Sequence, residues 1–363
     1  MCLMGIFTLS QCNKSVILDD GDPIIIEPSN YSTIAFIGRI TDNSAGWSLC
    51  IMDKSGDNMR KIVEMTTTCQ KPVRSNSGTK LLFITLTPPD YHYELYSVNI
   101  DGTGLTLIDN AKNGLIGSPD WSPDDRQIIY VKYSNDNREK SDFIIYDMFN
   151  KTHKVLNIEG GEDDKHSPKF SPDGKQIAYC ATVKSDTTFI HSHCHHHIYK
   201  VDVNGKNNQL IIKDASSPKW SFQGDKIVYS SSGVGGSSQI FVANANGSNQ
   251  KQLTSTVSPR IWPGWPPDGN GDPQWTLDGK KIVYVSWENE RPEIFIMNSD
   301  GNNKKRLTTA EFRDESPEIT PDGKHILFSS RKSDMMNGIW IMSLDGSNQK
   351  VISKTGIYPV ACK

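Results

Sequence analysis

The chain has 363 residues, of which 36% are hydrophobic and 22% are charged, and its formal net charge is −3 at pH 7. This length allows one large all-β domain or two smaller domains. The nearly balanced charge argues against a nucleic-acid-binding protein, which usually carries a basic stripe. No apolar run approaches the roughly 20 residues that a membrane-spanning helix needs.

The N-terminal segment is short and apolar and reads MCLMGIFTLSQC, ending at Cys12. It is typical of the end of a bacterial lipoprotein signal, although Gln11 replaces the usual small residue and the positively charged start is missing. We expect residues 1–22 to be a signal-like segment and tether, with Cys12 as the lipidated residue, and residues 23–363 to form one domain. The alternative is an ordinary apolar N-terminal segment. Contact with a membrane is expected only through this lipid anchor.

One phrase recurs along the rest of the chain. It reads GSPDWSPDDRQIIY from Gly117, HSPKFSPDGKQIAY from His166, SSPKWSFQGDKIVY from Ser216, GDPQWTLDGKKIVY from Gly271 and ESPEITPDGKHILF from Glu315. The prolines at the third position of these copies are 49, 50, 55 and 44 residues apart. Periods of about 40 to 50 residues indicate the blades of a β-propeller.

Each repeat predicts four antiparallel strands. A short segment around the proline comes first, and a turn such as SPDGK leads into a β-branched and aromatic run such as KQIAY. After a variable loop comes a second such run, for example IYKVDV, which ends in an Asn-Gly or Asp-Gly pair. These pairs are a strong hairpin signal, and a short last strand such as KQLT completes the unit. Four such strands make one propeller blade.

The sequence predicts seven blades, with six as the alternative. The middle hairpins start near Tyr31, Thr79, Arg126, Lys175, Asp225, Lys280 and Lys324. The first hairpin lacks a clear inner strand of its own, and the C-terminal segment IYPVACK offers a spare one, because Tyr358-Pro359-Val360 matches Lys71-Pro72-Val73. We expect this tail to close the ring and remove the exposed sheet edges. The rival donor is DPIII at residues 22–26.

The repeat resembles a known family. The units SPDWSPDDRQIIY…DMFNK and PQWTLDGKKIVYVSWENERPEIFIMNSDGNNKKRLT look like the WD-repeat-like propeller repeats of the TolB family. The resemblance covers residues 71–353 well and residues 31–63 weakly. It implies the propeller fold and is a poor guide to function, because one fold serves many functions. The family's namesake has an α/β domain before a six-bladed propeller, whereas we expect no such domain and seven blades here.

The predicted topology assigns the loops to two faces of the disc. If the strands of a blade are named A to D from the centre outward, the short A–B and C–D turns share one face, the tight-turn face. The B–C and D–A loops share the other, the long-loop face, and carry all the long insertions, at residues 183–196 and 254–271. Loops on a rigid scaffold carry function more often than the scaffold does. We therefore expect the ligand on the long-loop face, and drift of unconstrained loops is the alternative.

Aromatic and basic residues concentrate in these loops. Tryptophan and arginine are enriched at binding hot spots, and the prolines of the insertion SPRIWPGWPPDGNGDPQW stiffen it, which lowers the ordering cost of binding. Alternatively, the two tryptophans of this insertion fold onto the disc as a plug. The predicted ligand-binding residues are Tyr91, His92, His166, Arg260, Trp262, Trp265, Trp287 and Arg331. The expected ligand is a protein, a peptide or a glycan, and no nucleic acid.

Two segments suggest metals. Imidazole and thiolate suit zinc, copper or nickel, so the run HSHCHHH predicts that any tight transition-metal site uses His193, His195 and His197, with Cys194 as a further candidate. If the strand begins near His195, then His195 and His197 share one strand face and His196 points the other way. A solvated loop that binds metal adventitiously is the alternative. The run DGNGD imitates a calcium loop with oxygen ligands at alternate positions, namely Asp268, Asn270 and Asp272. There, Pro273 and Gly279 replace the required Gly and Glu.

Three functions remain open from the sequence. The chain contains no Gly-x-Ser-x-Gly motif, which favours a non-catalytic, ligand- or protein-binding propeller of the bacterial cell envelope, in the periplasm or at the cell surface. The first alternative is a metal-dependent, carbohydrate-active enzyme similar to oligogalacturonate lyases, which resemble this fold and hold a metal through His and Gln side chains. The second alternative is a structural docking module in a surface assembly.

Overall fold

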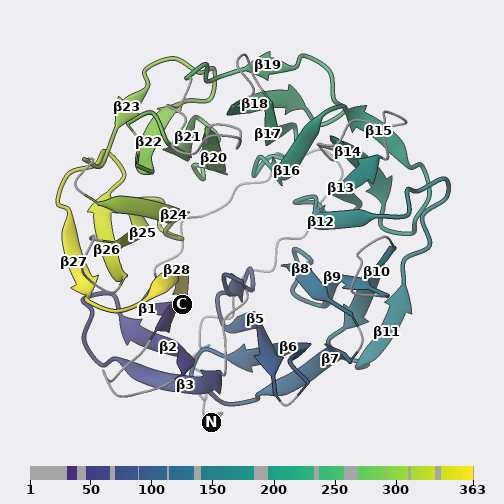
Figure 1. Ribbon diagram of the computed structural model, residues 1–363, viewed down its shortest axis with the longest axis horizontal. Helices are drawn as coiled ribbons and strands as arrows, with labels where there is room; N and C mark the ends of the chain where they lie inside the picture. Colours follow the sequence, from purple (N-terminus) through teal and green to yellow (C-terminus); the bar gives the residue numbers. More distant parts are fainter. Residues whose placement is uncertain are drawn as a thin grey trace, which may run out of the picture.

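The computed structural model is all-β and describes residues 31–38, 46–65, 70–88, 90–112, 114–134, 140–183, 195–232, 237–256, 269–289, 291–309, 312–331 and 337–362. These residues form seven four-stranded antiparallel sheets, which stand around a central axis as the blades of one propeller (Figure 1). The seven blades predicted from the repeat are therefore confirmed. Within the described ranges, no helix is long and apolar enough to cross a lipid bilayer.

Blades 2 to 4 each use four consecutive strands, whereas blade 1 takes its inner strand from the C-terminal segment. Blade 1 consists of β28 (Ile357–Cys362), β1 (Thr33–Gly38), β2 (Trp47–Asp53) and β3 (Arg60–Met65). Blade 2 consists of β4 (Val73–Arg74), β5 (Lys80–Thr87), β6 (His92–Asn99) and β7 (Thr106–Ala111). Blade 3 consists of β8 (Ile116–Trp121), β9 (Gln127–Tyr133), β10 (Ser141–Asp147) and β11 (Thr152–Val155). Blade 4 consists of β12 (Lys165–Phe170), β13 (Gln176–Val183), β14 (His195–Asp202) and β15 (Gln209–Ile212).

The remaining three blades continue around the ring. Blade 5 consists of β16 (Ala215–Trp220), β17 (Lys226–Ser232), β18 (Ser238–Asn244) and β19 (Lys251–Gln252). Blade 6 consists of β20 (Asn270–Trp275), β21 (Lys281–Ser286), β22 (Glu293–Asn298) and β23 (Lys305–Arg306). Blade 7 consists of β24 (Arg313–Ile319), β25 (His325–Arg331), β26 (Gly338–Ser343) and β27 (Lys350–Ser353).

The ring closes through the C-terminal strand, as predicted from the Tyr-Pro-Val match. β28 pairs with β1 in antiparallel register, with Cys362 opposite Thr33 and Val360 opposite Ala35. Alternate residues of β28 enter different cores, because Val360 packs with the blade 1 and blade 2 residues whereas Ala361 packs with those of blade 7. The last strand of the chain therefore links the first blade to both of its neighbours.

The recurring proline has a structural reason. Every inner strand from β8 to β24 has a register shift at the residue pair that contains it, for example between His166 and Lys169 in blade 4. The residue before the proline has a positive φ, such as 53° at Ser167 and 55° at Ser217. Proline has no backbone N–H and is tolerated only at edge strands and bulges. The repeat therefore marks a β-bulge on the innermost strand of each blade.

Hydrophobic contacts between neighbouring blades form the core. Between blades 3 and 4, for instance, Phe143 packs edge-on against Tyr179, with ring centroids 5.3 Å apart. The indole of each inner-strand tryptophan also donates a hydrogen bond to a carbonyl of the preceding blade: Trp121 to Val73, Trp220 to Lys169 and Trp275 to Lys219. These repeated contacts hold the blades in a fixed spacing and give the loops a rigid platform.

Candidate functional site

The tight-turn face is shaped by close contacts between successive blades. In the C–D turn of blade 4, Gly205 has a φ of 87°, and a Cβ built on it would lie 1.9 Å from the carbonyl oxygen of Asn157. The equivalent Gly247 of blade 5 would meet the carbonyl oxygen of Ile211 at 2.2 Å. Only glycine fits such a position. The Asn-Gly and Asp-Gly pairs therefore bring each turn against the backbone of the blade before it.

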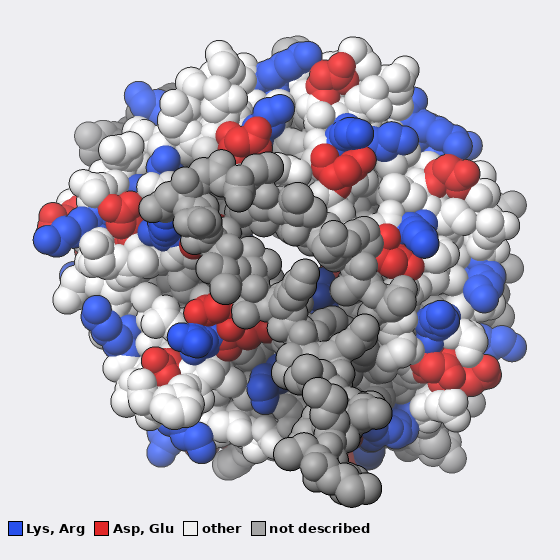
Figure 2. Space-filling model, turned by 180° about the vertical axis from the view of Figure 1, so that it is seen from behind, with Lys and Arg blue, Asp and Glu red and all other residues white. Residues whose placement is uncertain are grey.

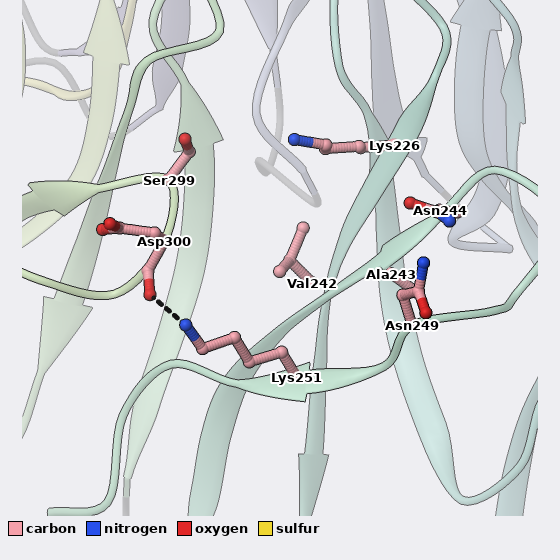
Figure 3. A pocket seen from close by; sticks show the side chains of 8 residues that line it. All are labelled: Lys226, Val242, Ala243, Asn244, Asn249, Lys251, Ser299 and Asp300. Atoms are coloured by element: carbon pink, nitrogen blue, oxygen red, sulfur yellow. Dashed lines mark hydrogen bonds between the residues drawn. The ribbon is translucent and has the colours of Figure 1, made fainter.

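A pocket of about 240 Å³ lies on this side, between blades 5 and 6. Figure 3 shows the side chains that line it. At its edge the Nζ of Lys251 donates to the backbone carbonyl of Asp300 at 2.8 Å. The same contact recurs between other blades, from Lys305 to Asp345 at 2.7 Å and from Arg60 to Asp101 at 3.1 Å. Because the same contact recurs at three junctions between blades, the pocket is a general feature of the repeat and not a specific site.

On the long-loop face, the structure places Tyr91 in the B–C turn of blade 2 and His92 at the start of β6. Tyr91 is 62% exposed. The Nε2 of His92 lies 3.1 Å from the Glu94 carboxylate, which also accepts hydrogen bonds from Thr87 and Tyr96. His92 is therefore held in place within the sheet, whereas Tyr91 projects into solvent.

A second group on this face joins blades 6 and 7. The guanidinium carbon of Arg313 lies 4.8 Å from the centre of the Trp287 ring, which is within the range of a cation–π contact. Arg331, which is exposed, is the cross-strand partner of Arg313. Sequence reasoning selected Trp287 and Arg331 but missed Arg313. Its position at the first residue of the inner strand β24, where a D–A loop ends, is the signal that could have found it.

Several predicted residues lie outside the described part of the chain: Cys12, His193, Arg260, Trp262, Trp265 and Asp268. Their predicted roles stay predictions. Of the proposed calcium ligands, Asn270 is buried, and its amide donates to the side-chain oxygen of Gln239 at 2.9 Å. Asp272 occupies the inner-strand bulge, with a φ of 48°. Its negative charge partly opposes the lowering of the Lys219 pKa by burial.

The histidines of blade 4 separate onto two sides of β14. His195 begins the strand, and its side chain lies outside the described residues. The Nδ1 of His197 accepts the backbone N–H of Asp214 at 3.1 Å. His196 points the other way, as predicted, and its Nδ1 lies 3.0 Å from the Nε2 of His166. Within the described ranges, no three His, Cys, Asp or Glu side chains are grouped so that they could hold a metal ion.

His166 therefore reaches blade 4's long-loop end from the inner strand, as the sequence suggested. Burial and, to a smaller degree, the neighbouring His196 lower the pKa of His166 to about 4. Its ring is consequently neutral at physiological pH. The contact with His196 could not be read from the sequence, because it depends on the bulge in β12 and on the register of β14 against β13.

Charged side chains also lie on the inner strands or, for Lys71, shortly before one. The Nζ of Lys71 lies 2.7 Å from the Glu318 carboxylate, and that of Lys169 lies 2.8 Å from the Asp120 carboxylate. Burial lowers the pKa of Lys219 to about 8, and the nearby Lys71 adds to this shift. Sequence reasoning missed this group, although the residue after the marker proline is polar in all five strong copies of the repeat.

Two buried carboxylates lie at the long-loop end of blades 6 and 7. Glu293 is fully buried beside Arg306, with 3.6 Å between the guanidinium and the carboxylate, and Asp314 is 3% exposed. Each has one carboxylate oxygen without a hydrogen-bond partner. Burial raises the pKa of Asp314 to about 6, and hydrogen bonds from Ser330 and Thr308 partly oppose this shift.

This raised pKa predicts a pH-dependent effect of the Asp314→Asn substitution. Between about pH 4 and pH 6 the folded protein holds a proton that the unfolded chain has released, so the contribution of Asp314 to stability falls as the pH rises through this range. The variant should match the wild type at pH 4 and exceed it by up to about 3 kcal/mol at pH 7. Urea unfolding of both proteins at the two pH values measures this. An equal difference at both pH values would contradict the expected titration.

Comparisons with known proteins agree with this architecture. Residues 79–356 match the family model described as the TolB beta propeller domain. The chain is 28% identical over 278 residues to the "Tol-Pal system protein TolB" of Francisella tularensis subsp. mediasiatica, a match that covers 74% of this chain and 59% of that protein. The chain thus spans about three-fifths of the length of this curated relative.

Two solved structures show the same fold at low sequence identity. TolB from Acinetobacter baumannii superposes with a TM-score of 0.55 and 19% identity, covering 90% of this chain and 82% of that one. The β-propeller domain of the Trilobed protease from Pyrococcus furiosus superposes with a TM-score of 0.67 and 14% identity, covering 90% of this chain and 95% of that one. Because the family model matches most of the sequence and all seven blades are present, the chain belongs to the TolB beta propeller domain family.

Proposed function

We propose that this chain is a non-catalytic, protein-binding propeller of the bacterial cell envelope. The observation that carries the proposal is the match of residues 79–356 to the TolB propeller family, together with curated relatives that are named as Tol-Pal system proteins. The proposed partner is accordingly another protein of such an envelope system. A peptide segment of that partner fits this proposal better than a glycan, because the relatives' printed names refer to a protein system.

We further propose that the partner binds to the long-loop face. The arrangement of Trp287 under Arg313, with Arg331 beside them and Tyr91 exposed on blade 2, supports this choice. Such aromatic and arginine side chains supply most of the binding energy at protein interfaces. On the face drawn in Figure 2, basic and acidic side chains are interspersed around the ring, which suits a polar protein surface better than a uniformly charged partner.

The proposed location of the protein is the bacterial cell envelope. We propose that residues 23–363 form the propeller and that residues 1–22 act as a tether, with Cys12 as a lipid attachment point, in the periplasm or at the cell surface. The insertion with Arg260, Trp262 and Trp265 belongs to the proposed binding face. Replacing Trp262 and Trp265 by alanine tests this assignment, in the binding assay described next for Trp287.

Replacing Trp287 by alanine should weaken partner binding by roughly 30-fold, which corresponds to a hot-spot loss of about 2 kcal/mol. The loss arises because the variant removes both the aromatic surface and the support of Arg313. Surface plasmon resonance against the Tol-Pal system proteins of the same cell measures the affinity, and thermal unfolding checks that the propeller remains intact.

Phe149 provides the matched control. It is an aromatic residue that is 89% exposed in the C–D turn of blade 3, on the tight-turn face. Phe149→Ala removes a similar amount of apolar surface from the opposite side of the disc and should leave the affinity unchanged. If Phe149→Ala weakens binding and Trp287→Ala does not, the assignment of the face is wrong.

A further inference from the structure

Two potential metal ligands of blade 4, His166 and His196, lie close together. The Nε2 of His166 and the Nδ1 of His196 are 3.0 Å apart, and the two rings meet edge to face with centroids 4.7 Å apart. Both side chains are partly accessible. At this distance a proton lies between the two nitrogens in a hydrogen bond, whereas a metal ion bound by both, with bonds of about 2 Å, would lie beside the line that joins them.

The strands around this pair hold it rigidly. His166 is the cross-strand partner of Cys180, and His196 is the partner of Thr182, so both histidines flank the same strand, β13. The Thr182 hydroxyl lies 3.2 Å from the Nδ1 of His196, and the Ser167 hydroxyl lies 3.1 Å from the Nδ1 of His166. The Ser167 hydroxyl therefore contacts the nitrogen of His166 that faces away from His196, which fixes the orientation of that ring, as in the outer shells of known metal sites. The Thr182 hydroxyl contacts the same Nδ1 of His196 that faces His166.

We propose that the Nε2 of His166 and the Nδ1 of His196 bind one borderline divalent transition-metal ion of the zinc class. Zinc bonds to imidazole nitrogens are about 2.0–2.1 Å long and tetrahedral, which places two ligand nitrogens roughly 3.3 Å apart. The observed 3.0 Å separation requires an opening of only a few tenths of an ångström, within the reach of small side-chain rotations. The Thr182 hydroxyl lies beside the same point, and water completes the coordination.

This site differs from the one predicted from the HSHCHHH run. The side chain of His197 lies on the opposite side of β14 from His196 and interacts with Asp214. A metal at the His166–His196 pair therefore uses one residue of the run together with one residue of the inner strand. The inference is independent of the proposed protein partner, because its ligands are side chains of one blade.

Calorimetric titration of the full chain with zinc chloride tests the proposal. The wild type should bind zinc at this pair, and His166→Ala and His196→Ala should each weaken the affinity by roughly 100-fold or more. His197→Ala is the matched control, because it removes an imidazole from the same strand on the other side, and it should retain the wild-type affinity. Loss of binding in His197→Ala with retention in His166→Ala would overturn the proposal and assign the metal to the histidine-rich loop.

A second measurement on the wild type covers the case in which a variant does not fold. Nuclear magnetic resonance of the imidazole nitrogens, recorded with and without zinc, should show large shifts of the Nε2 of His166 and the Nδ1 of His196. Unshifted signals for these two nitrogens at saturating zinc would show that the contact is only a hydrogen bond, and would overturn the proposal.

Discussion

Removal of residues 357–363 is expected to lower the free energy of unfolding by at least about 5 kcal/mol. The truncation deletes β28, whose Val360, Ala361 and Cys362 are almost fully buried. Burial of each apolar side chain of this size contributes on the order of 1–3 kcal/mol. The deletion also leaves the inner edge of β1 unpaired. Urea denaturation of the truncated and complete chains measures the difference.

A synthetic peptide with the sequence of residues 357–363 serves as the control for this truncation. Added in excess, it should bind the open edge of blade 1 and restore part of the lost stability, because a ligand that binds only the folded state stabilises it by mass action. A scrambled peptide of the same composition should have no effect. Unfolding of the truncated chain at the same urea concentration as the complete chain would show that ring closure does not depend on this strand.

The Gly205→Ala substitution is expected to lower the free energy of unfolding by about 3 kcal/mol or more. The added methyl group meets the carbonyl oxygen of Asn157, which belongs to the connection from blade 3 and cannot move as a flexible side chain does. Alanine is also strained at a φ of 87°. The expected result combines both effects, and chemical denaturation of the purified variant measures it.

Gly160 separates the two effects, because its φ is 65° and no atom lies within 4 Å of a Cβ built on it. Gly160→Ala carries only the backbone strain and should cost about 1 kcal/mol. An equal loss of stability in both variants would indicate that the contact between the turn and the preceding blade contributes nothing.

The repeat allowed the number of blades and the closure of the ring to be predicted from the sequence. Both depend on local patterns: the Asn-Gly and Asp-Gly pairs that end the third strands, and the proline that marks each inner strand. The match of Tyr358-Pro359-Val360 to the other copies identified β28 correctly, because the same bulge recurs with a φ of 56° at Tyr358.

The contacts between strands could not be predicted in the same way. His166 and His196 are 30 residues apart, and Lys71 and Glu318 are 247 residues apart, and each pair meets only once the register and the spacing of the blades are fixed. The buried Glu293 was missed for a different reason. It begins the strand EIFIMN, and a carboxylate at the start of a strand ordinarily lies in solvent, whereas here it is fully buried.

Site-specific photo-crosslinking in the native host tests most directly whether a protein partner binds the long-loop face. A photoreactive amino acid would be placed on the long-loop face at Tyr91, Trp287 or Arg331, and on the tight-turn face at Phe149, Asn246 or Asp345. A discrete crosslinked protein is expected from the long-loop positions and none from the tight-turn positions. Crosslinks to the same protein from the tight-turn positions alone would contradict it.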